Sequence, residues 1–379
     1  MMKRQMIYFD NSATTFPKPV SVRRACSEGL ERYGGNPGRS GHELSIRAAQ
    51  KIYEVRSLAA ELFAAEPENV AFTQNCTYAL NMAIKGIMQY GGHLIISSYE
   101  HNSVARPSYR LTQTAGVRLS IAGVSNDDEQ TVQTFKKLID KDTKCICVTA
   151  ASNVTGRALP VKALGELCKR YGICLIVDGA QACGVSDLKL SDGINLLCTA
   201  GHKSLYGPAG TGLLITDGEY CLSTIIEGGT GATSAELEQT PTMPEKLESG
   251  TLNTAGILGL GEGIKFVKAK SIDRIRAHEQ MLCERFIEGV RSVKGIKLYE
   301  TDVKKLPIVA FNIGDMPSEE LASALSDKGF ALRGGLHCAP LAHNTLGTLG
   351  QGAVRFSPSV FNNTYQTDSL VMAIRRLSV

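Results

Sequence analysis

The chain has 379 residues, of which 43% are hydrophobic and 21% are charged. This balance is typical of a globular protein and excludes a disordered chain, a collagen and a coiled coil. The 41 Lys and Arg residues exceed the 37 Asp and Glu residues by only four, and no basic block occurs, so nucleic acid is not expected as a main partner.

The cysteines point to a reducing compartment. There are eleven of them, without the spacing of a disulfide framework, and most stand in apolar runs such as residues 144–148. The first residues contain no apolar stretch of signal-peptide length, and no run of about 18 apolar residues occurs anywhere. We therefore expect a cytoplasmic protein with no membrane partner.

Helical patterns and short apolar runs alternate through the first two thirds of the chain. Continuous apolar runs indicate strands that are buried on both faces, hence a mostly parallel sheet covered by helices. Two further runs, 196–198 and 212–216, flank a Gly- and Pro-containing loop and are expected to pair antiparallel. The expected helices are 45–63, 77–88 and 159–171, and the expected strands are 70–73, 93–97, 144–149 and 173–177.

The pattern changes after about residue 250. Residues 256–293 are helical and rich in charge, which predicts one long helix between two domains. Strands are expected over 308–313 and 353–356, with a helix over 317–328. This order of elements predicts a small α+β domain at the C-terminus.

The stretch 199–212 is the richest in candidate chemistry. Lys203 stands in a glycine-crowded loop between two apolar strands, and a partly buried lysine of lowered pKa suits Schiff-base chemistry. A phosphate-binding P-loop is rejected, because His202 and not glycine precedes the lysine. A solvated loop lysine is the plain alternative.

Three other candidates follow expected strands. Asp178 ends an apolar strand, where it could hold a pyridinium nitrogen or simply cap the next helix. His101 could stack on a planar cofactor and relay protons, or be an ordinary hydrogen-bonded histidine. Residues 73–77 enter a helix whose N-terminus, with the Thr77 hydroxyl, could bind a phosphate or merely carry a cap.

The last candidates lie near the C-terminus. Cys338 is the one cysteine expected in a Gly- and Pro-containing loop, and near His337 and Arg333 it could be a thiolate of low pKa. A zinc site of His337, Cys338 and His343 has no standard spacing. Arg355, inside an expected strand, could grip a carboxylate or sit at the strand's surface edge.

Together these motifs resemble the cysteine desulfurases of the class V aminotransferase group. The resemblance runs almost end to end, through residues 8–15, 177–181, 201–203 and 333–340. It implies an α/β fold of type I that binds pyridoxal 5′-phosphate (PLP), with a mostly parallel seven-stranded sheet in a large domain (15–255). A smaller domain would combine residues 1–14 with 256–379.

The resemblance also implies roles for matching residues, and no metal. Lys203 would bind the cofactor covalently and move protons, His101 would stack on its ring, and Cys338 would accept the sulfur. The other cofactor contacts would be Asp178 to the pyridine nitrogen, Gln181 to the ring hydroxyl, and Cys76, Thr77 and His202 to the phosphate, with Thr251 reaching it from a second subunit. Asn153 and Arg355 would bind the substrate carboxylate, with Arg333 and Asn11 also in the substrate site.

Two departures from the family pattern stand at the expected phosphate site. Ala200 precedes the Gly-His-Lys motif where relatives carry Ser or Thr, which leaves open whether Thr199 compensates. Position 76 is Cys where Thr is common, which favours binding of the phosphate by the backbone.

The implied activity is conversion of L-cysteine to L-alanine with a persulfide on Cys338, for sulfur mobilisation in processes such as iron–sulfur cluster assembly. The implied partners are a second copy of the chain and a sulfur-acceptor protein. The alternatives are a selenocysteine lyase acting on L-selenocysteine, another PLP-dependent lyase that would not need Cys338, and a non-catalytic sulfur-relay or scaffold protein.

Overall fold

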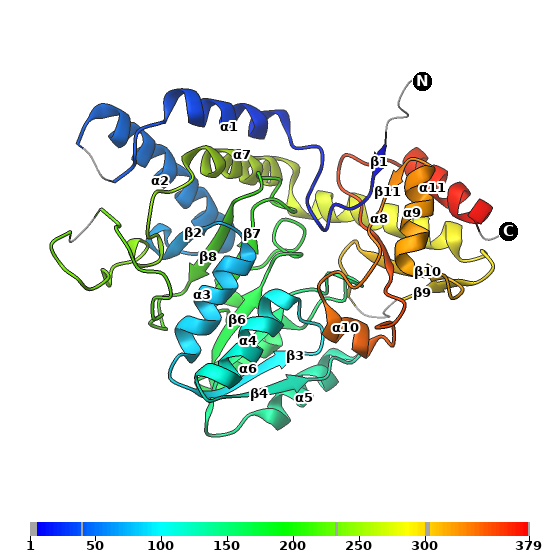
Figure 1. The fold of residues 1–379 in the computed structure, drawn as a ribbon, viewed down its shortest axis with the longest axis horizontal. Helices are drawn as coiled ribbons and strands as arrows, with labels where there is room; N and C mark the ends of the chain where they lie inside the picture. The colour runs from blue at the N-terminus through cyan, green and yellow to red at the C-terminus, as the bar shows by residue number, and fades with distance from the viewer. Residues whose placement is uncertain (1–5, 39–40, 232–233, 300–303, 378–379) are drawn as a thin grey trace.

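A seven-stranded sheet forms the centre of the computed structural model, which describes residues 6–38, 41–231, 234–299 and 304–377 (Figure 1). The strand order is β2-β8-β7-β6-β5-β3-β4, and β8 alone runs antiparallel to its neighbours. The mostly parallel sheet and the antiparallel pairing of 196–198 with 212–216 are therefore confirmed. The strands are β2 (Val70–Thr73), β3 (Gly92–Ser97), β4 (Val117–Ala122), β5 (Thr143–Thr149), β6 (Cys174–Asp178), β7 (Leu196–Ala200) and β8 (Gly212–Thr216).

Helices cover both faces of this sheet, which is why its inner strands are continuous apolar runs. In β3, Leu94 and Ile96 pack under α3 and α4, whereas Ile95 packs into the core on the other face. The buried Cys145 and Cys147 of β5 also face α3 and α4 and act as small apolar residues. One face carries α3 (Cys76–Met88) and α4 (Asn102–Thr114); the other carries α2 (Glu43–Phe63), α5 (Asp128–Leu138), α6 (Val161–Tyr171) and α7 (Thr254–Lys270), with α1 (Val20–Arg32) lying along α7.

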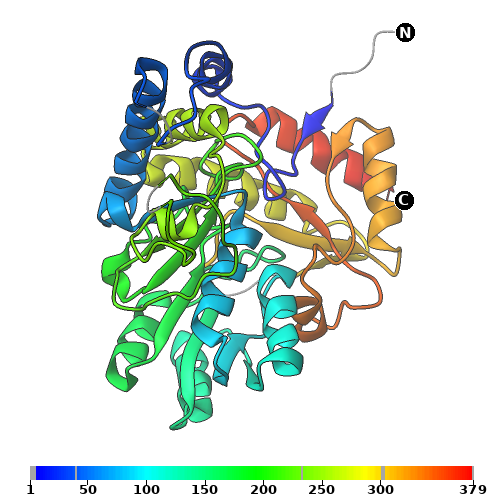
Figure 2. The same cartoon turned by 60° about the vertical axis from the view of Figure 1, so that its left-hand side comes forward.

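A second, smaller core lies beside the central sheet and joins the two ends of the chain (Figures 1 and 2). Phe9 packs against Phe356 with ring centroids 4.7 Å apart, and Phe356 stacks on Phe286 at 4.4 Å. The strands β9 (Ile296–Leu298), β10 (Val309–Ile313) and β12 (Val354–Phe356) form one antiparallel sheet around this core, and β1 (Ile7–Tyr8) pairs parallel with β11 (Phe330–Ala331). The helices around it are α8 (Ile272–Val290), α9 (Ser318–Asp327) and α11 (Thr364–Leu377). The short α10 (Pro340–Thr345) lies nearby.

The exact division of the chain into domains at residues 14 and 255 stays a prediction. Residues 1–5 of the expected N-terminal part lie outside the described residues. Among the described helices, none is long and apolar enough to cross a membrane.

The single long helix expected over 256–293 is wrong. The chain forms α7 and α8, separated by Ser271, whose φ of 70° lies outside the helical region. The Ser271 side chain accepts a hydrogen bond from the Arg274 N–H at 3.4 Å and so caps α8. Ser271 followed by Asp273 in the first turn is the start signal of a new helix, which the helical periodicity on both sides concealed.

A buried carboxyl on α8 connects the smaller core to the loop that carries Lys203. Glu279 accepts a hydrogen bond from the Tyr206 hydroxyl at 3.2 Å, and the Tyr206 N–H donates to the Lys203 carbonyl at 2.8 Å. Burial raises the pKa of Glu279 to about 8. The folded protein therefore holds this carboxyl protonated at neutral pH.

Replacing Glu279 by Gln should stabilise the protein at alkaline pH. The pKa rises from 4.5 to about 8 on folding, so the folded state binds the extra proton and loses stability as pH increases through this interval. Glu279→Gln, which keeps an acceptor for Tyr206, should unfold at a higher temperature than the parent at pH 8 and at the same temperature near pH 4.5. The exposed Glu284→Gln on the same helix is the control, and equal behaviour of the two variants would contradict this account.

Candidate active site

The carboxyl ends of the parallel strands meet at one edge of the sheet, and a cavity of about 190 Å³ opens there. Lys203 follows β7, Asp178 ends β6, and His101 follows β3. These three side chains, distant in sequence, therefore share one cavity. Its lining residues are Asn75, Cys76, Thr77, His101, Ser103, Thr149, Asn153, Asp178, Ala180, Gln181, Ala200, His202 and Lys203.

Lys203 lies in this cavity and not at the surface as a solvated loop lysine. Burial lowers the pKa of its ammonium group, and the negative charge of Asp178 opposes that shift. The loop before it is tight: a Cβ on Gly201 would lie 2.2 Å from the Thr211 Oγ1, so only glycine fits. An amine of lowered pKa in a shielded site is suited to attack a carbonyl carbon and to exchange protons.

The N-terminal segment holds the peptide bonds around Lys203, a contact that the sequence did not predict. The His202 carbonyl accepts hydrogen bonds from the Thr15 N–H at 3.0 Å, the Thr14 hydroxyl at 3.2 Å and the Lys18 ammonium at 2.6 Å. The Thr15 hydroxyl donates to the Lys203 carbonyl at 2.9 Å. The only signal in the sequence was that Thr14 and Thr15 belong to the opening motif, residues 8–15; Lys18 lies outside it.

Asp178 caps the following turn and also lines the cavity, where its role toward a ring nitrogen stays a prediction. Its Oδ1 accepts the Ala180 N–H at 2.9 Å, which caps the following turn, and the Cys76 thiol at 3.4 Å. The carboxylate also lines the cavity and is 4% exposed. A buried carboxylate in this position can hold a ring nitrogen in its protonated form.

His101 likewise caps a helix while it faces the cavity. Its Nδ1 accepts the Ser103 N–H at 3.0 Å at the start of α4, which leaves Nε2 to carry the proton of the neutral ring. Burial lowers the pKa of His101 to about 4, despite the opposing charge of Asp178. The imidazole is therefore neutral at physiological pH.

Glu100, beside His101, is a buried residue that the sequence reasoning missed, and it lies next to the site because it bonds Thr149 of the cavity lining. Its Oε1 accepts the Thr149 N–H at 2.8 Å and bonds the Ser97 hydroxyl, which ties the ends of β3 and β5 together. Burial raises its pKa to about 8. The signal was its place directly before His101 at a strand end, a position usual for site residues in parallel sheets.

The N-terminus of α3 faces the cavity. The Asn75 side chain caps the helix by accepting the Tyr78 N–H at 2.9 Å, and the free N–H groups of the first turn lie beside Cys76 and Thr77 at the cavity. The Cys76 thiol donates to Asp178, so the prediction that a phosphate binds here rests on the backbone N–H groups.

Thr199 does not take the place of a phosphate-binding hydroxyl. Its Oγ1 donates to the Gly179 carbonyl at 3.5 Å, and Ala200 is the residue that lines the cavity. On the other side, burial lowers the pKa of His202 to about 4, so this ring would contact a phosphate as a neutral hydrogen-bonding group.

Cys338 is exposed on a strained loop that is tied to the cavity. The φ angles of His337 and Cys338 are 50° and 56°, in the left-handed region that costs energy for residues other than glycine. The Asn102 N–H donates to the Cys338 carbonyl at 2.7 Å, and the Asn153 amide donates to the His337 carbonyl at 2.8 Å. The loop backbone is thus fixed by residues that adjoin or line the cavity.

The thiol of Cys338 has one cationic neighbour. The Nη2 of Arg333, an exposed residue, lies 3.8 Å from the Cys338 Sγ. His337, by contrast, is buried and uses Nε2 on the Ala353 carbonyl at 2.9 Å. In the described residues His337, Cys338 and His343 do not form a group that could hold a metal ion.

Cys338 is one of two exposed cysteines. Cys221, in the loop after β8, is also exposed, with the Lys246 Nζ 3.3 Å from its Sγ. Neither residue lines the 190 Å³ cavity, but Cys338 bonds the start of α4 at its rim. The sequence reasoning passed over Cys221 because no Gly or Pro marks its immediate neighbours.

Arg355 is a buried site residue and not a strand-edge surface residue. Its side chain is 2% exposed, and its guanidinium pairs with Asp10 at 2.7 Å and donates to the Asn153 carbonyl at 2.9 Å. Asn153 lines the cavity, and its Oδ1 is buried without a partner among the described residues. Arg355 and Asn153 therefore lie together beside the cavity.

Asn11 and Thr251 lie elsewhere, and their assigned roles stay predictions. The Asn11 amide donates to the Ser357 carbonyl at 3.0 Å and accepts the Phe16 N–H at 3.2 Å. Thr251 is exposed and lines a separate hollow of about 380 Å³ with Gln74.

The segment before Thr251 is anchored by a buried ion pair. Glu248 binds Arg56 of α2 through both carboxylate oxygens at 2.7 and 2.8 Å, and its Oε1 accepts the Phe72 N–H at 2.7 Å. Thr251 therefore follows an anchored residue and lies outside the 190 Å³ cavity of the same chain.

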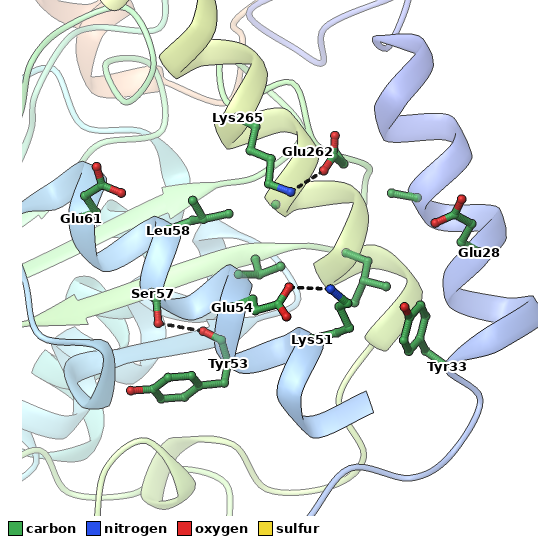
Figure 3. Close-up of a pocket in the computed structure, with 14 residues that line it drawn as sticks. Glu28, Tyr33, Lys51, Tyr53, Glu54, Ser57, Leu58, Glu61, Glu262 and Lys265 are labelled. Atoms are coloured by element: carbon green, nitrogen blue, oxygen red, sulfur yellow. Dashed lines mark hydrogen bonds and ion pairs between the residues drawn. The ribbon is translucent and has the colours of Figure 1, made fainter. Parts of the chain in front are cut away.

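A larger hollow lies elsewhere on the protein and is not this site. It measures about 600 Å³ and lies among α1, α2 and α7, where Lys51 pairs with Glu54 and Lys265 with Glu262, each at 2.7 Å (Figure 3). These pairs are partly exposed, and none of the predicted site residues is among the lining residues. Surface ion pairs of this kind contribute little energy and carry no chemistry.

The residues of the 190 Å³ cavity fit PLP. They supply an amine of lowered pKa, a buried carboxylate, a neutral imidazole and a helix N-terminus, which correspond to the aldehyde, ring nitrogen, ring face and phosphate of that cofactor. Gln181, whose amide donates to the Ser12 carbonyl at 3.1 Å, lines the same cavity.

Comparison with known proteins gives a consistent result. The family model "Aminotransferase class-V" matches residues 7–370. A probable cysteine desulfurase of Methanothermobacter thermautotrophicus is 31% identical, over 97% of this chain and 93% of the relative. One from Mycolicibacterium paratuberculosis is 30% identical over 99% of this chain, which spans 56% of that longer protein.

Solved structures agree in fold over nearly the whole chain. The cysteine desulfurase of Thermococcus onnurineus superposes with a TM-score of 0.90 and 29% identity, covering 98% of this chain and 94% of that one. The cysteine desulfurase CsdA of Escherichia coli gives 0.89 and 25%, covering 99% and 96%. With this fold and these cavity residues, the chain belongs to the cysteine desulfurases of the class V aminotransferase family, which are PLP-dependent enzymes.

Proposed function

We propose that this protein converts L-cysteine to L-alanine and receives the sulfur as a persulfide on Cys338. The observation that carries the proposal is the exposed Cys338 thiol on a loop fixed to the rim of the cavity that holds Lys203 and Asp178. Other PLP-dependent reactions of amino acids do not need a thiol at this place. A scaffold protein would not need Lys203 and Asp178 in one shielded cavity.

The cavity residues have separate tasks in this reaction. PLP, when bound, is an electron sink that stabilises negative charge at the substrate Cα. Asp178 would stabilise the protonated ring nitrogen of the cofactor, and His101, neutral at physiological pH, would accept or return a proton beside it. Lys203, with its lowered pKa, holds the cofactor and moves the proton at Cα.

The sulfur step takes place between the substrate and Cys338. The Cys338 thiolate attacks the substrate sulfur, an S–S bond forms, and the Cβ–S bond breaks with its electron pair going to carbon. Cβ then takes a proton, which completes alanine and leaves Cys338–S–SH. The Nη2 of Arg333, 3.8 Å from the Sγ, lies beside the place where the sulfur is received. No external oxidant or reductant is required for this transfer.

The remaining assignments concern partners. We propose a homodimer in which Thr251 reaches the cofactor phosphate of the other subunit, because Thr251 is exposed and lies outside the cavity of its own chain. The exposure of Cys338 on a short loop suits transfer of the sulfur to a separate acceptor protein. The proposed location is the cytoplasm, where the many unpaired thiols would stay reduced.

Replacing Cys338 by Ser should abolish sulfur transfer but leave the cofactor in place. We expect a loss of alanine and sulfide formation of at least about 100-fold, because the attacking thiolate is removed, with an unchanged absorption spectrum of the bound cofactor. Cys221→Ser removes the other clearly exposed thiol and should act like the parent. If Cys338→Ser kept parental activity, persulfide formation on Cys338 would be ruled out.

Two changes in the cavity should separate binding of the cofactor from its activation. Lys203→Ala should lose the absorption band of covalently held PLP, since its amine is the attachment point. Asp178→Asn should still bind PLP but lower kcat by about 100-fold or more, because the ring nitrogen loses its carboxylate. Absorption spectra and alanine release measure these effects, and a Lys203→Ala enzyme with the parental spectrum would overturn the assignment.

A further inference from the structure

Two of the three guanidinium nitrogens of Arg355 donate hydrogen bonds within the described part of the chain, and the third does not. Nη2 donates to the Asp10 Oδ1 at 2.7 Å, and Nη1 donates to the Asn153 carbonyl at 2.9 Å. Nε is buried and has no partner among the described residues. Since an arginine has five N–H donors in one plane, fixing two of them sets the direction of the rest.

Positive charge exceeds negative charge among Arg355 and its charged neighbours Arg333 and Asp10. Burial lowers its pKa, Asp10 raises it, and the charge of the neighbouring Arg333 lowers it further. Arg333 and Arg355 are adjacent through a backbone bridge, and Asp10 is the acid that pairs with Arg355 in the described part of the chain. Two cations and one anion leave one positive charge, which matches a single carboxylate.

Asp10 is itself held firmly. Its backbone pairs with Ser357, two residues after Arg355 on the same strand segment, and the Ser357 N–H donates to the Phe9 carbonyl at 2.9 Å. The Ser12 N–H donates to the Ser357 hydroxyl at 3.0 Å. The Asp10 side chain is 18% exposed, so it has little freedom to leave the ion pair.

We propose that Asp10 is a positioning residue, which fixes the Arg355 guanidinium so that its remaining donors bind the α-carboxylate of an amino-acid substrate. This inference rests on the proposed function for the substrate class, but Asp10 has no part in the sulfur chemistry. Without Asp10, Arg355 would keep its charge but lose its fixed plane, and a bidentate contact depends on that plane. Removal of Asp10 should therefore weaken the binding of carboxylate ligands and leave the turnover rate unchanged.

The test compares ligands with and without a carboxylate on the PLP-loaded enzyme. Dissociation constants of L-alanine and of ethylamine are measured by calorimetry, together with KM and kcat for L-cysteine. In Asp10→Ala we expect L-alanine binding about tenfold weaker or more and a similar rise in KM, with kcat within about twofold and ethylamine binding unchanged. Asp10→Asn, which keeps the acceptor oxygen, should lose less affinity for L-alanine than Asp10→Ala. Asp315→Ala, which breaks an exposed ion pair with Lys297, should bind L-alanine like the parent.

The outcomes separate this inference from the proposed function. Unchanged L-alanine binding in Asp10→Ala would overturn it, and so would an equal loss for L-alanine and ethylamine, which would make Asp10 a purely structural residue. If the parent released no alanine from L-cysteine, the desulfurase proposal would fail. The comparison of L-alanine with ethylamine would still decide the role of Asp10, because it requires no turnover.

Discussion

The removal of Lys203 and Asp178 from water is the constraint on which the site depends. Both lie at the carboxyl ends of adjacent strands, where the sheet and its helices exclude most solvent. Burial lowers the pKa of the lysine, and the negative charge of the aspartate opposes this shift. Parallel strands make this arrangement available, because they bring residues of distant sequence to one edge.

A single short segment near the N-terminus holds the two halves of the site together. Thr14, Thr15 and Lys18 bond the carbonyls of His202 and Lys203, on the side of the large sheet. Asp10 pairs with Arg355 on β12, within the smaller core. The nine residues 10–18 thus connect the loop of Lys203 with Arg355. The geometry between them depends on this segment as much as on either core.

The sequence predicted the elements whose patterns are local. Continuous apolar runs identified β3, β5 and β6. The strand-end rule pointed to Asp178 and His101, and the glycine-crowded loop between two apolar strands pointed to Lys203. Ser271 was missed because one capping residue was outweighed by helical periodicity on both sides.

Other features depend on contacts between distant residues and could not be predicted. Asp10 and Arg355 are 345 positions apart, and neither residue type reveals its partner. Likewise, only the fold decides that Ala200 and not Thr199 faces the cavity, or that Arg355 is buried in its strand. The loop of Cys338 was identified by composition, but its attachment to Asn102 and Asn153 was not.

The most direct test of the central claim is to locate the transferred sulfur. Enzyme loaded with PLP is mixed with L-cysteine in the absence of reductant, thiols are alkylated, and peptides are analysed by mass spectrometry. The account predicts one additional sulfur atom on the peptide that contains Cys338 and none on the peptide that contains Cys221. Alanine formed without additional sulfur on Cys338 would contradict it.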